Sequence, residues 1–341
     1  MPDAQQPSLT TPFRIGDVEV ANRVLLAPLA GIGNWFVRLQ ARRHGAGLAV
    51  SEMVSSYAIR HGNERTLREM LTVHPDEHPV SIQLFGPDPD VMRGAAAAAA
   101  AAGADIVDLN MGCPVPKICK SGAGAALLRE PDRAVAVAQA AIEGSGLPVT
   151  VKLRSGLEPG DRSGFELALR LAAEAGVDGV GFHPRSAAVH HSGKPDYALA
   201  RELVNAVDVP VIISGGLRSA DTARRAYAES GADAVMIARG GLGAPWIFEE
   251  LTGRRTGAPS RAEILDEFNW VLDRGEEHWG PRRASRNLRK FYPWYLDQLG
   301  ITGRQADAYQ RTESVDAVRA MLRELPERGL AAPLAGETPS L

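Results

Sequence analysis

Residues 108–128 read DLNMGCPVPKICKSGAGAALL, and the interpretation of the chain begins with them. The apolar run 106–109 that leads into Asn110 is typical of a buried β-strand. Because proline disfavours helix in the residue before it, we expect Cys113 to be extended at the end of that strand. A strand end with an amide, a thiol and the nearby Lys117 can donate protons in a pocket. Without further context, a single cysteine at such a position is more often a buried thiol beside a surface loop than a reactive group.

Apolar runs of the same type recur through the sequence. We expect strands near residues 24–27, 48–53, 80–84, 105–109, 149–153, 179–182, 211–213 and 234–237. Most of these runs are continuous rather than alternating, as expected for parallel strands covered on both faces. Helical spacing appears at residues 88–102, 131–143, 163–175, 196–206 and 219–230. Eight strands alternating with helices predict an α/β fold, a (β/α)₈ TIM barrel.

The alternative fold is an open, doubly wound parallel sheet. It is disfavoured because no G-x-G-x-x-G follows the first strand, where a dinucleotide-binding fold would need it. Residues 13–23 alternate apolar and polar side chains around Gly16 and Asp17, which predicts a short hairpin. Such a hairpin could plug one end of a barrel.

The sequence divides into a large and a small domain. We expect the barrel domain over 13–255 and a helical domain over 259–330, with amphipathic helices at 261–278, 282–299 and 306–325. The final residues 331–341, AAPLAGETPSL, are small and turn-rich, which predicts a disordered tail.

Composition limits the class of protein. The 341 residues are 45% apolar and 23% charged, as in soluble globular proteins, and the net charge of −3 argues against a generic, strongly basic nucleic-acid binder. The two cysteines are too close together to connect distant segments, which favours a reducing, cytoplasmic location. No apolar run is long enough for a bilayer and no signal peptide is apparent, so we expect no membrane partner.

The expected strand ends carry a consistent set of polar residues. In a TIM barrel the reactive groups lie at the C-terminal ends of the strands. Here those ends carry Glu52, Gln83, Asn110, Cys113, Lys152, Arg154, His183, Arg185, Ser214 and Arg239. Together they predict a polar, mostly cationic pocket. Glu52 is a candidate general base or a structural carboxylate, and without a matching ligand set the histidines 183, 190 and 191 do not indicate a metal.

Two glycine-bearing loops predict a phosphate site. They are SGGLRSADTARR at 214–225 and ARGGLGAPW at 238–246, which follow the seventh and eighth strands. Barrels frequently bind phosphate at this position through backbone N–H groups and a helix N-terminus, and Arg239 could add a charged contact. The other reading is that the glycines form simple tight turns. Lys152 lies in an apolar strand and needs an anionic partner, so the set favours flavin mononucleotide (FMN).

The chain resembles the tRNA-dihydrouridine synthases, most closely their bacterial B-type branch. The similar segments are APLAG at 27–31, VSEM at 50–53, SIQLFG at 81–86, NMGCPVPKICKSGAG at 110–124, VKLRSG at 151–156, FHPRS at 182–186, SGG at 214–216, GADAVMIARGGLGAPWIF at 231–248 and RKFYPWY at 289–295. The similarity extends over roughly residues 13–300 in the family's order and spacing.

The resemblance implies an enzyme that reduces the 5,6 double bond of selected uridines in tRNA with FMN, which NADPH recharges. It implies that FMN contacts Pro28, Leu29, Ala30, Gln83, Lys152, Ser214, Gly215, Gly216, Ala238 and Arg239. Asn110, Lys152, Arg154 and His183 would surround the uracil, and Cys113 would donate a proton to its carbon 5. Family members often have Asn where this chain has Ser214, and some have Asp in place of Gly216.

A basic segment in the helical domain matches a tRNA partner. Arg282, Arg286 and Lys290 recur at every fourth position, which predicts a cationic helix face that contacts tRNA. The aromatic residues Tyr292 and Trp294 could serve either for packing or for stacking on bases.

Two other functions remain open at this point. One is an FMN-dependent barrel oxidoreductase that acts on a free pyrimidine or a small enone, which would not need the basic helical domain. The other is an RNA-binding factor whose barrel has lost its chemistry, against which the complete set of Asn110, Cys113, Lys152 and His183 argues.

Overall fold

Eight parallel strands form a closed barrel in the computed structural model, which describes residues 6–325. The strands are β3 (Val24–Leu26), β4 (Leu48–Val50), β6 (Val80–Phe85), β7 (Ile106–Asn110), β8 (Val149–Arg154), β9 (Gly179–His183), β10 (Val211–Ser214) and β11 (Ala234–Ile237). Each strand pairs with its neighbours in parallel, and pairing between β4 and β6 completes the ring, while the short β5 (Val54–Ser55) pairs in parallel with the C-terminal end of β6. The predicted (β/α)₈ barrel is confirmed.

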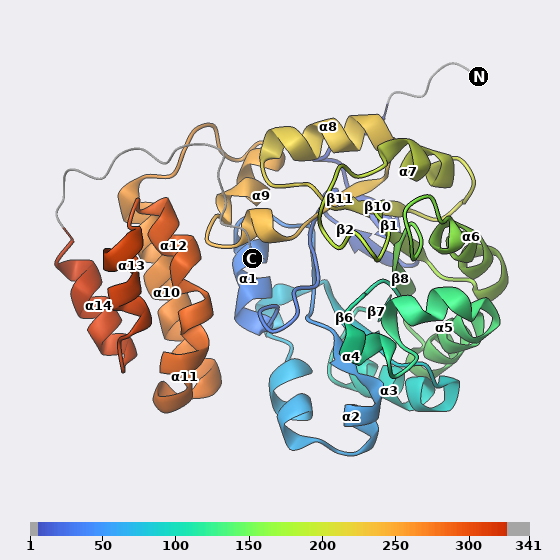
Figure 1. Cartoon of the computed structure of the whole chain (residues 1–341), viewed down its shortest axis with the longest axis horizontal. Helices are drawn as coiled ribbons and strands as arrows, with labels where there is room; N and C mark the ends of the chain where they lie inside the picture. The colour runs from blue at the N-terminus through green and yellow to red at the C-terminus, as the bar shows by residue number, and fades with distance from the viewer. Residues whose placement is uncertain (1–5, 326–341) are drawn as a thin grey trace. The chain divides into compact units, whose positions relative to one another are not determined.

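Helices surround the barrel on its outer side (Figure 1). The longer ones are α1 (Trp35–Arg43), α3 (Pro89–Ala101), α5 (Pro131–Ser145), α6 (Ser163–Arg170), α7 (Tyr197–Val204), α8 (Ala220–Ser230) and α9 (Trp246–Leu251). Shorter helices follow β5 and β7, namely α2 (Ser56–Arg60), η1 (Thr66–Met70), α4 (Pro116–Cys119) and η3 (Gly124–Arg129). The strand expected at 48–53 is too long, because the chain leaves β4 at Ser51, whose hydroxyl accepts the Gln83 backbone N–H at 2.9 Å.

Small residues bring α3 and α5 close together. The alanine run at 95–102 forms most of α3, as its helix propensity predicts. Gly144 of α5 lies so near α3 that an added Cβ would be 2.1 Å from the Arg93 carbonyl oxygen. By contrast, a Cβ on Gly94 of α3 would meet nothing within 4 Å. The contact between the two helices therefore depends on glycine at one position and not at the other.

The predicted hairpin plugs the N-terminal end of the barrel. It consists of β1 (Phe13–Ile15) and β2 (Val18–Val20), and its apolar side chains join a buried cluster with barrel residues such as Leu48 and Ile212. The turn residue Gly16 has φ +56°, and an added Cβ there would be 2.8 Å from Pro148, just before β8. The hairpin thus closes the end at which the strands begin.

Carboxylates secure the strands at that same end. Asp105, Asp178 and Asp233 each accept the backbone N–H that opens a neighbouring strand, with distances of 2.7, 2.9 and 2.9 Å. These contacts satisfy donors at the start of β6, β8 and β10. Residues at this end of a TIM barrel generally stabilise the fold.

A second compact unit follows the barrel. It includes Leu242–Trp246 and resumes at Thr256, while Ile247–Arg255 belongs to the first unit. Its helices are α10 (Arg261–Trp279), α11 (Pro281–Asn287), η6 (Leu288–Lys290), α12 (Tyr292–Gln298), α13 (Gly303–Gln310) and α14 (Val315–Arg323), coloured orange to red in Figure 1.

Two of the helices predicted for the second unit are interrupted. The helix expected at 282–299 tightens into η6 and breaks at Phe291, since Pro293, in the first turn of α12, lacks the N–H that would continue the ladder. The helix expected at 306–325 is divided between α13 and α14, where the Ser314 side chain accepts from Ala317 N and starts a new helix. The tail predicted over 331–341 lies outside the described residues.

Candidate active site

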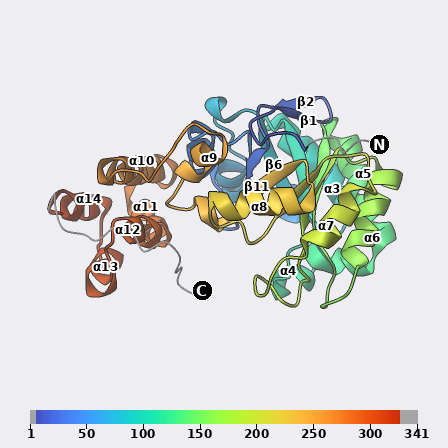
Figure 2. The ribbon, with the colours of Figure 1, turned by 90° about the horizontal axis from the view of Figure 1, so that it is seen from above.

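The polar residues predicted at the strand ends lie together at the C-terminal end of the barrel. Strand register puts Asn110 of β7 beside Lys152 of β8, and Arg154 of β8 beside His183 of β9. In Figure 2, α4, which follows Cys113, lies at the end of the barrel opposite the β1–β2 hairpin. The reactive side chains are therefore at the end that the hairpin leaves open.

A chain of hydrogen bonds joins β6, β7 and β8 at this end. The Thr150 hydroxyl donates to one oxygen of Asp108, and Gln83 Nε2 donates to the other, both at 2.6 Å. Asn110 Nδ2 donates to Gln83 Oε1 at 2.9 Å, and Asn110 Oδ1 accepts the Cys113 backbone N–H at 2.9 Å. Burial raises the pKa of Asp108 to about 6. The loop that carries the cysteine is thus attached to side chains inside the barrel.

Cys113 is a partly buried, free thiol. Burial raises its pKa above the ordinary value, so the thiol is protonated at neutral pH. Its carbonyl oxygen accepts from the Ala125 backbone N–H at 3.0 Å and from the Cys119 thiol at 3.4 Å. Gly124, with φ +61°, passes so close that an added Cβ would be 2.6 Å from that oxygen. The loop folds back on itself and holds the thiol in place.

Lys152 lies partly buried among other cations. Its Nζ donates to Ser214 Oγ of β10 at 3.0 Å, so Ser214 contacts the lysine directly. Burial, with a contribution from nearby Arg154, lowers the pKa of Lys152 to about 8. The Asp108 carboxylate raises the pKa of Lys152, but its two oxygens already accept hydrogen bonds from Gln83 and Thr150. This environment favours binding of an additional anion.

Arg154 connects two loops above the barrel. Its Nε donates to Gly112 O at 3.0 Å, and its Nη1 donates to Ser186 O at 3.1 Å and to His190 O at 2.7 Å. His190 has φ +50°, which is unusual for a residue other than glycine, and this contact helps to hold it. Within residues 6–325, Nη2 has no hydrogen-bond partner and is the nitrogen of Arg154 that could bind a ligand.

His183 is buried and neutral. Arg185 Nη1 lies 3.2 Å from His183 Nε2, and because arginine can only donate, Nε2 accepts and the proton is on Nδ1. Burial and the surrounding cations hold the pKa of His183 far below its ordinary value. The ring packs on Gly215, where an added Cβ would be 2.4 Å away. His191 stacks on it with ring centroids 5.9 Å apart.

The two predicted phosphate loops adjoin each other. Gly215 and Gly216 have φ of +99° and +79°, a region that glycine adopts readily. An added Cβ on Gly240 would be 2.7 Å from Leu217 O, so the loop after β11 touches the loop after β10. α8 starts there with a capping box at Ser219. The glycines therefore allow the two loops and the N-terminus of α8 to approach one another closely. Isolated tight turns would not require this approach.

Arginines gather at these loops. Burial and the charges of Arg239 and Arg218 lower the pKa of Arg185, while burial and Arg218 lower the pKa of Arg239. Arg239 forms no ion pair within residues 6–325. Three mutually repelling guanidinium groups beside glycine turns suit a phosphate.

The loop after β3 completes the rim. Its residues Pro28, Leu29 and Ala30 are partly or fully exposed. The Glu52 carboxylate accepts the Gly31 backbone N–H at 2.7 Å, and Glu52 N donates to Gly33 O at 3.1 Å. Of the two roles considered for Glu52, these contacts support the structural one.

The donor set fits an anionic, phosphate-bearing group such as FMN. Lys152, Arg154, Arg185 and Arg239 share this end of the barrel with one buried acid, Asp108. In the described part of the chain, no group of three or more His, Cys, Asp and Glu side chains is placed to hold a metal ion. No helix among residues 6–325 is long and apolar enough to span a membrane.

Comparison with known proteins gives the family. The family model described as Dihydrouridine synthase (Dus) matches residues 25–326. The chain belongs to the dihydrouridine synthase family. The resemblance found in the sequence is thereby confirmed, and with it the assignment to an oxidoreductase family.

Two relatives of this dihydrouridine synthase match the chain over nearly their full length. The tRNA-dihydrouridine synthase B of Pseudomonas aeruginosa is 35% identical over 316 residues, which cover 91% of this chain and 95% of that protein. The protein of the same name from Xanthomonas axonopodis is 34% identical over 318 residues, which cover 92% and 95%.

Solved structures support the fold. An old yellow enzyme homologue from Zymomonas mobilis superposes with a TM-score of 0.56 and 16% identity, over 76% of this chain and 96% of that chain. Morphinone reductase in complex with tetrahydroNAD gives a TM-score of 0.52 and 18% identity, over 76% and 94%. At this identity the similarity shows a shared barrel fold.

The predicted cationic face belongs to the second unit. Arg282, Arg286 and Lys290 are all exposed there, and Lys290 Nζ lies 5.4 Å from the centre of the Trp279 ring. The neighbouring Arg289 is turned inward and donates to Thr312 O at 2.8 Å.

The aromatic residues beside this face pack inside the unit. Tyr292 and Tyr295 are buried against Phe268, with ring centroids 5.8 and 4.8 Å from it. Trp294 is partly exposed and packs edge-on against Phe291 at 5.5 Å. Of the two uses considered for the aromatic residues, the buried tyrosines serve packing.

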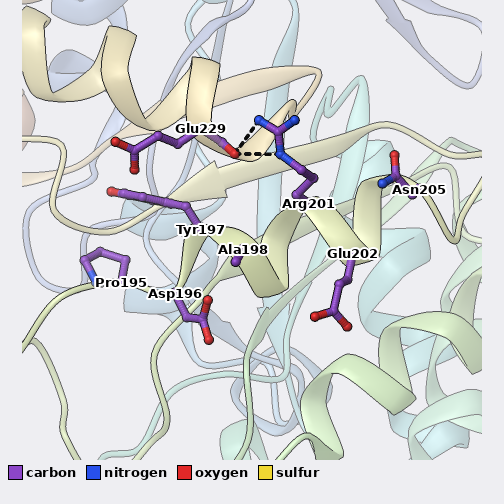
Figure 3. A pocket seen from close by; sticks show the side chains of 8 residues that line it. All are labelled: Pro195, Asp196, Tyr197, Ala198, Arg201, Glu202, Asn205 and Glu229. Carbon is purple, nitrogen blue, oxygen red and sulfur yellow. Dashed lines mark hydrogen bonds between the residues drawn. The ribbon is translucent and has the colours of Figure 1, made fainter.

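A separate hollow of about 520 Å³ lies on the outer side of the barrel, beside α7 and the end of α8 (Figure 3). Its arginine, Arg201, donates to the carbonyl oxygens of Ala228 and Glu229 and so satisfies the C-terminal end of α8. Tyr197 OH reaches the phosphate loop by donating to Gly215 O at 2.8 Å. The hollow contains none of the strand-end side chains, and its Arg201 and Tyr197 bond to backbone carbonyl oxygens of the fold.

Two residues that the structure places at the candidate active site had no assigned role in the prediction from sequence. Asp108 lies in the apolar run 106–109, and an acid in such a run is the signal that could have identified it. Arg185 appeared only as one of the strand-end residues, yet it fixes the tautomer of His183. That contact depends on side-chain direction, which sequence spacing does not define.

Proposed function

We propose that this protein uses FMN, recharged by NADPH, to reduce the 5,6 double bond of specific uridines in tRNA to dihydrouridine. Membership of the dihydrouridine synthase family and relatives named tRNA-dihydrouridine synthase B support this substrate. The observation that carries the proposal is the partly buried, free thiol of Cys113 at the same barrel end as a cluster of cations and glycine-bearing loops.

The proposed FMN contacts are those expected from the family. The residues are Pro28, Leu29, Ala30, Gln83, Lys152, Ser214, Gly215, Gly216, Ala238 and Arg239. The adjoining glycine loops and their arginines support a phosphate there, and Lys152 supports an anionic ring system nearby. When bound, FMN would supply the hydride chemistry, passing a hydride from NADPH to carbon 6 of the uracil.

In this proposal Cys113 donates the proton that carbon 5 of the uracil requires. Burial keeps the sulfur protonated, which suits a proton donor better than a nucleophile. The hydrogen bond from Cys113 N to Asn110 Oδ1 holds the donor in place.

Three other groups would orient and polarise the uracil. Lys152, Arg154 Nη2 and the Nδ1–H of His183 are donors that could stabilise negative charge on the uracil carbonyl oxygens. The target base must leave its stack to enter a barrel end, so we expect a flipped uridine. The exposed face of Arg282, Arg286 and Lys290 would bind tRNA phosphates from the helical domain.

The test is to purify the protein, identify its bound flavin and assay tRNA from a strain that lacks the protein. We expect a yellow protein that NADPH bleaches anaerobically, and new dihydrouridine in the tRNA by mass spectrometry of its nucleosides. Equal turnover of free uracil or a small enone by the barrel alone would favour the free-substrate oxidoreductase. Colourless protein that binds tRNA and refuses FMN would favour the RNA-binding factor.

A further inference from the structure

Asp108 is a buried acid to which the proposed chemistry gives no role. It is 3% exposed and lies in the middle of β7, beside Gln83 of β6 and Thr150 of β8 in the strand register. Its oxygens accept one hydrogen bond from each of these neighbours. A carboxylate in this position needs donors on both sides, and it has them.

Four groups, Asp108, Gln83, Asn110 and the Cys113 backbone, form a series of hydrogen bonds, and the donor and acceptor in each bond are determined by the two ends of the series. An ionised carboxylate can only accept, so the amide nitrogen of Gln83 must face Asp108 and its oxygen must face Asn110. At the other end, the Cys113 backbone N–H can only donate, so the oxygen of Asn110 must face it and the nitrogen must face Gln83. Both ends require the same orientation of the two amides.

We propose that Asp108 is a positioning residue that sets the orientation of the Gln83 and Asn110 amides and thereby the placement of the Cys113 loop. This inference rests on the proposed function, in which Cys113 is the proton donor. If the amides turned over, Asn110 Nδ2 would face the Cys113 N–H, and two donors would repel each other. The thiol would then move from its place above the barrel, and small displacements of a reacting group are costly.

A second role for Asp108 must be separated from this one. The acid also acts electrostatically on Lys152 of the neighbouring strand, so its charge alone could be what matters. Asp108→Asn separates the two roles, because it removes the charge but retains an oxygen for Gln83. The Thr150 hydroxyl can rotate and accept from the new amide nitrogen, so the hydrogen-bonded chain can persist.

The experiment compares Asp108→Leu, Asp108→Asn and the control Asp178→Leu. Asp178 is a carboxylate at the opposite end of the barrel, where it accepts from Val149 N. The first measurement is the alkylation rate of Cys113 by iodoacetamide, in flavin-free and in flavin-loaded protein. Trypsin cleaves after Lys117 and Lys120, so Cys113 and Cys119 are counted on different peptides. The second is single-turnover dihydrouridine formation, with NADPH-dependent bleaching measured separately.

We expect Asp108→Leu to speed alkylation of Cys113 about threefold or more, because a released loop exposes the thiol. Dihydrouridine formation should fall about tenfold, the effect of one misplaced hydrogen bond, while bleaching stays within about threefold. In Asp108→Asn, the alkylation rate and the dihydrouridine formation rate should both stay near the wild-type values. Asp178→Leu should lower the melting temperature and leave both rates unchanged.

Wild-type alkylation and product rates in folded Asp108→Leu would overturn the inference. So would an Asp108→Asn variant as impaired as Asp108→Leu, which would assign the effect to charge. If Asp108→Leu does not fold, Gln83→Leu interrupts the same chain and should give the same faster alkylation. If wild-type protein forms no dihydrouridine, the proposed function fails, whereas the alkylation rates still decide the role of Asp108.

Discussion

At the scale of single residues, the cysteine loop contains two thiols with different surroundings. Burial raises the pKa of the Cys113 thiol, whereas the Cys119 thiol donates to the Cys113 carbonyl oxygen. We expect Cys113→Ala to keep NADPH-dependent bleaching and to lower dihydrouridine formation by at least about a hundredfold, the range of lost acid catalysis. Stopped-flow absorbance and nucleoside mass spectrometry measure the two steps.

Cys119→Ser is the matched control for that variant. Serine keeps a donor for the Cys113 carbonyl oxygen, so both rates should stay within about threefold of the wild type. Loss of bleaching in Cys113→Ala, or equal loss of product in both variants, would contradict the assignment of the proton donor.

Lys152 should make the stability of the flavin-free protein depend on pH. Its pKa is about 8 in the fold against an ordinary 10.5, so between these values the unfolded chain binds more protons and stability rises with pH. Below pH 8 the cost of burying the charge is fully present. Lys152→Met should therefore raise the free energy of unfolding at pH 7 by about 1–3 kcal/mol, and the gain should vanish near pH 10.5.

Urea unfolding of the two flavin-free proteins at both pH values measures this difference. A gain of the same size at pH 7 and near pH 10.5 would indicate better packing by methionine and not relief of a buried charge.

At the scale of elements, the contact between α3 and α5 allows a paired test. Gly144→Ala should lower the free energy of unfolding by about 1–3 kcal/mol, because the new methyl group meets the Arg93 backbone. Gly94→Ala should raise it by about 0.5–1 kcal/mol, since Gly94 is an exposed helical glycine with open space around it. Thermal and urea unfolding measure both, and a stabilising Gly144→Ala would show that the helices separate easily.

The barrel strands could be predicted from the sequence because buried parallel strands are continuous apolar runs bounded by glycine and proline. The run at 234–237 was predicted with both ends correct, and that at 149–153 falls one residue short of β8. Two of the larger errors occur where a side chain ends or restarts an element. Ser51 ends β4 early, and Ser314 starts α14 inside a stretch with continuous helical spacing.

The active-site residues could be predicted as a set but their connections could not. Strand ends in a barrel meet at one rim, so Asn110 and Lys152 were expected to be near each other. The sequence does not give side-chain direction, so it did not reveal that most donors of Arg154 serve backbone carbonyls of two loops. It also did not distinguish Arg289, which turns inward, from its exposed neighbour Lys290.

At the scale of the whole molecule, the proposed function assigns chemistry to the barrel and tRNA affinity to the helical unit. Replacing Arg282, Arg286 and Lys290 together by glutamate should weaken tRNA binding about tenfold or more at low salt. It should also reduce the slope of log affinity against log salt by about two to three. NADPH-dependent bleaching should not change. Fluorescence anisotropy with labelled tRNA at several salt concentrations measures the binding.

Arg304→Glu is the control for the charge reversal. Arg304 is an exposed arginine of α13 in the same unit, so its replacement changes charge without altering the α11–η6 face. Equal weakening per charge at both places would mean that tRNA responds to the overall charge of the unit and not to this face.

The β1–β2 hairpin has a kinetic consequence for the proposed reaction. Because it closes one end of the barrel, reductant and RNA would share the other end as their entrance to the cofactor in the proposed reaction. NADPH and tRNA would then bind alternately, and each would dissociate before the other binds. Steady-state turnover should then give parallel lines in double-reciprocal plots, and excess NADPH should inhibit competitively against tRNA.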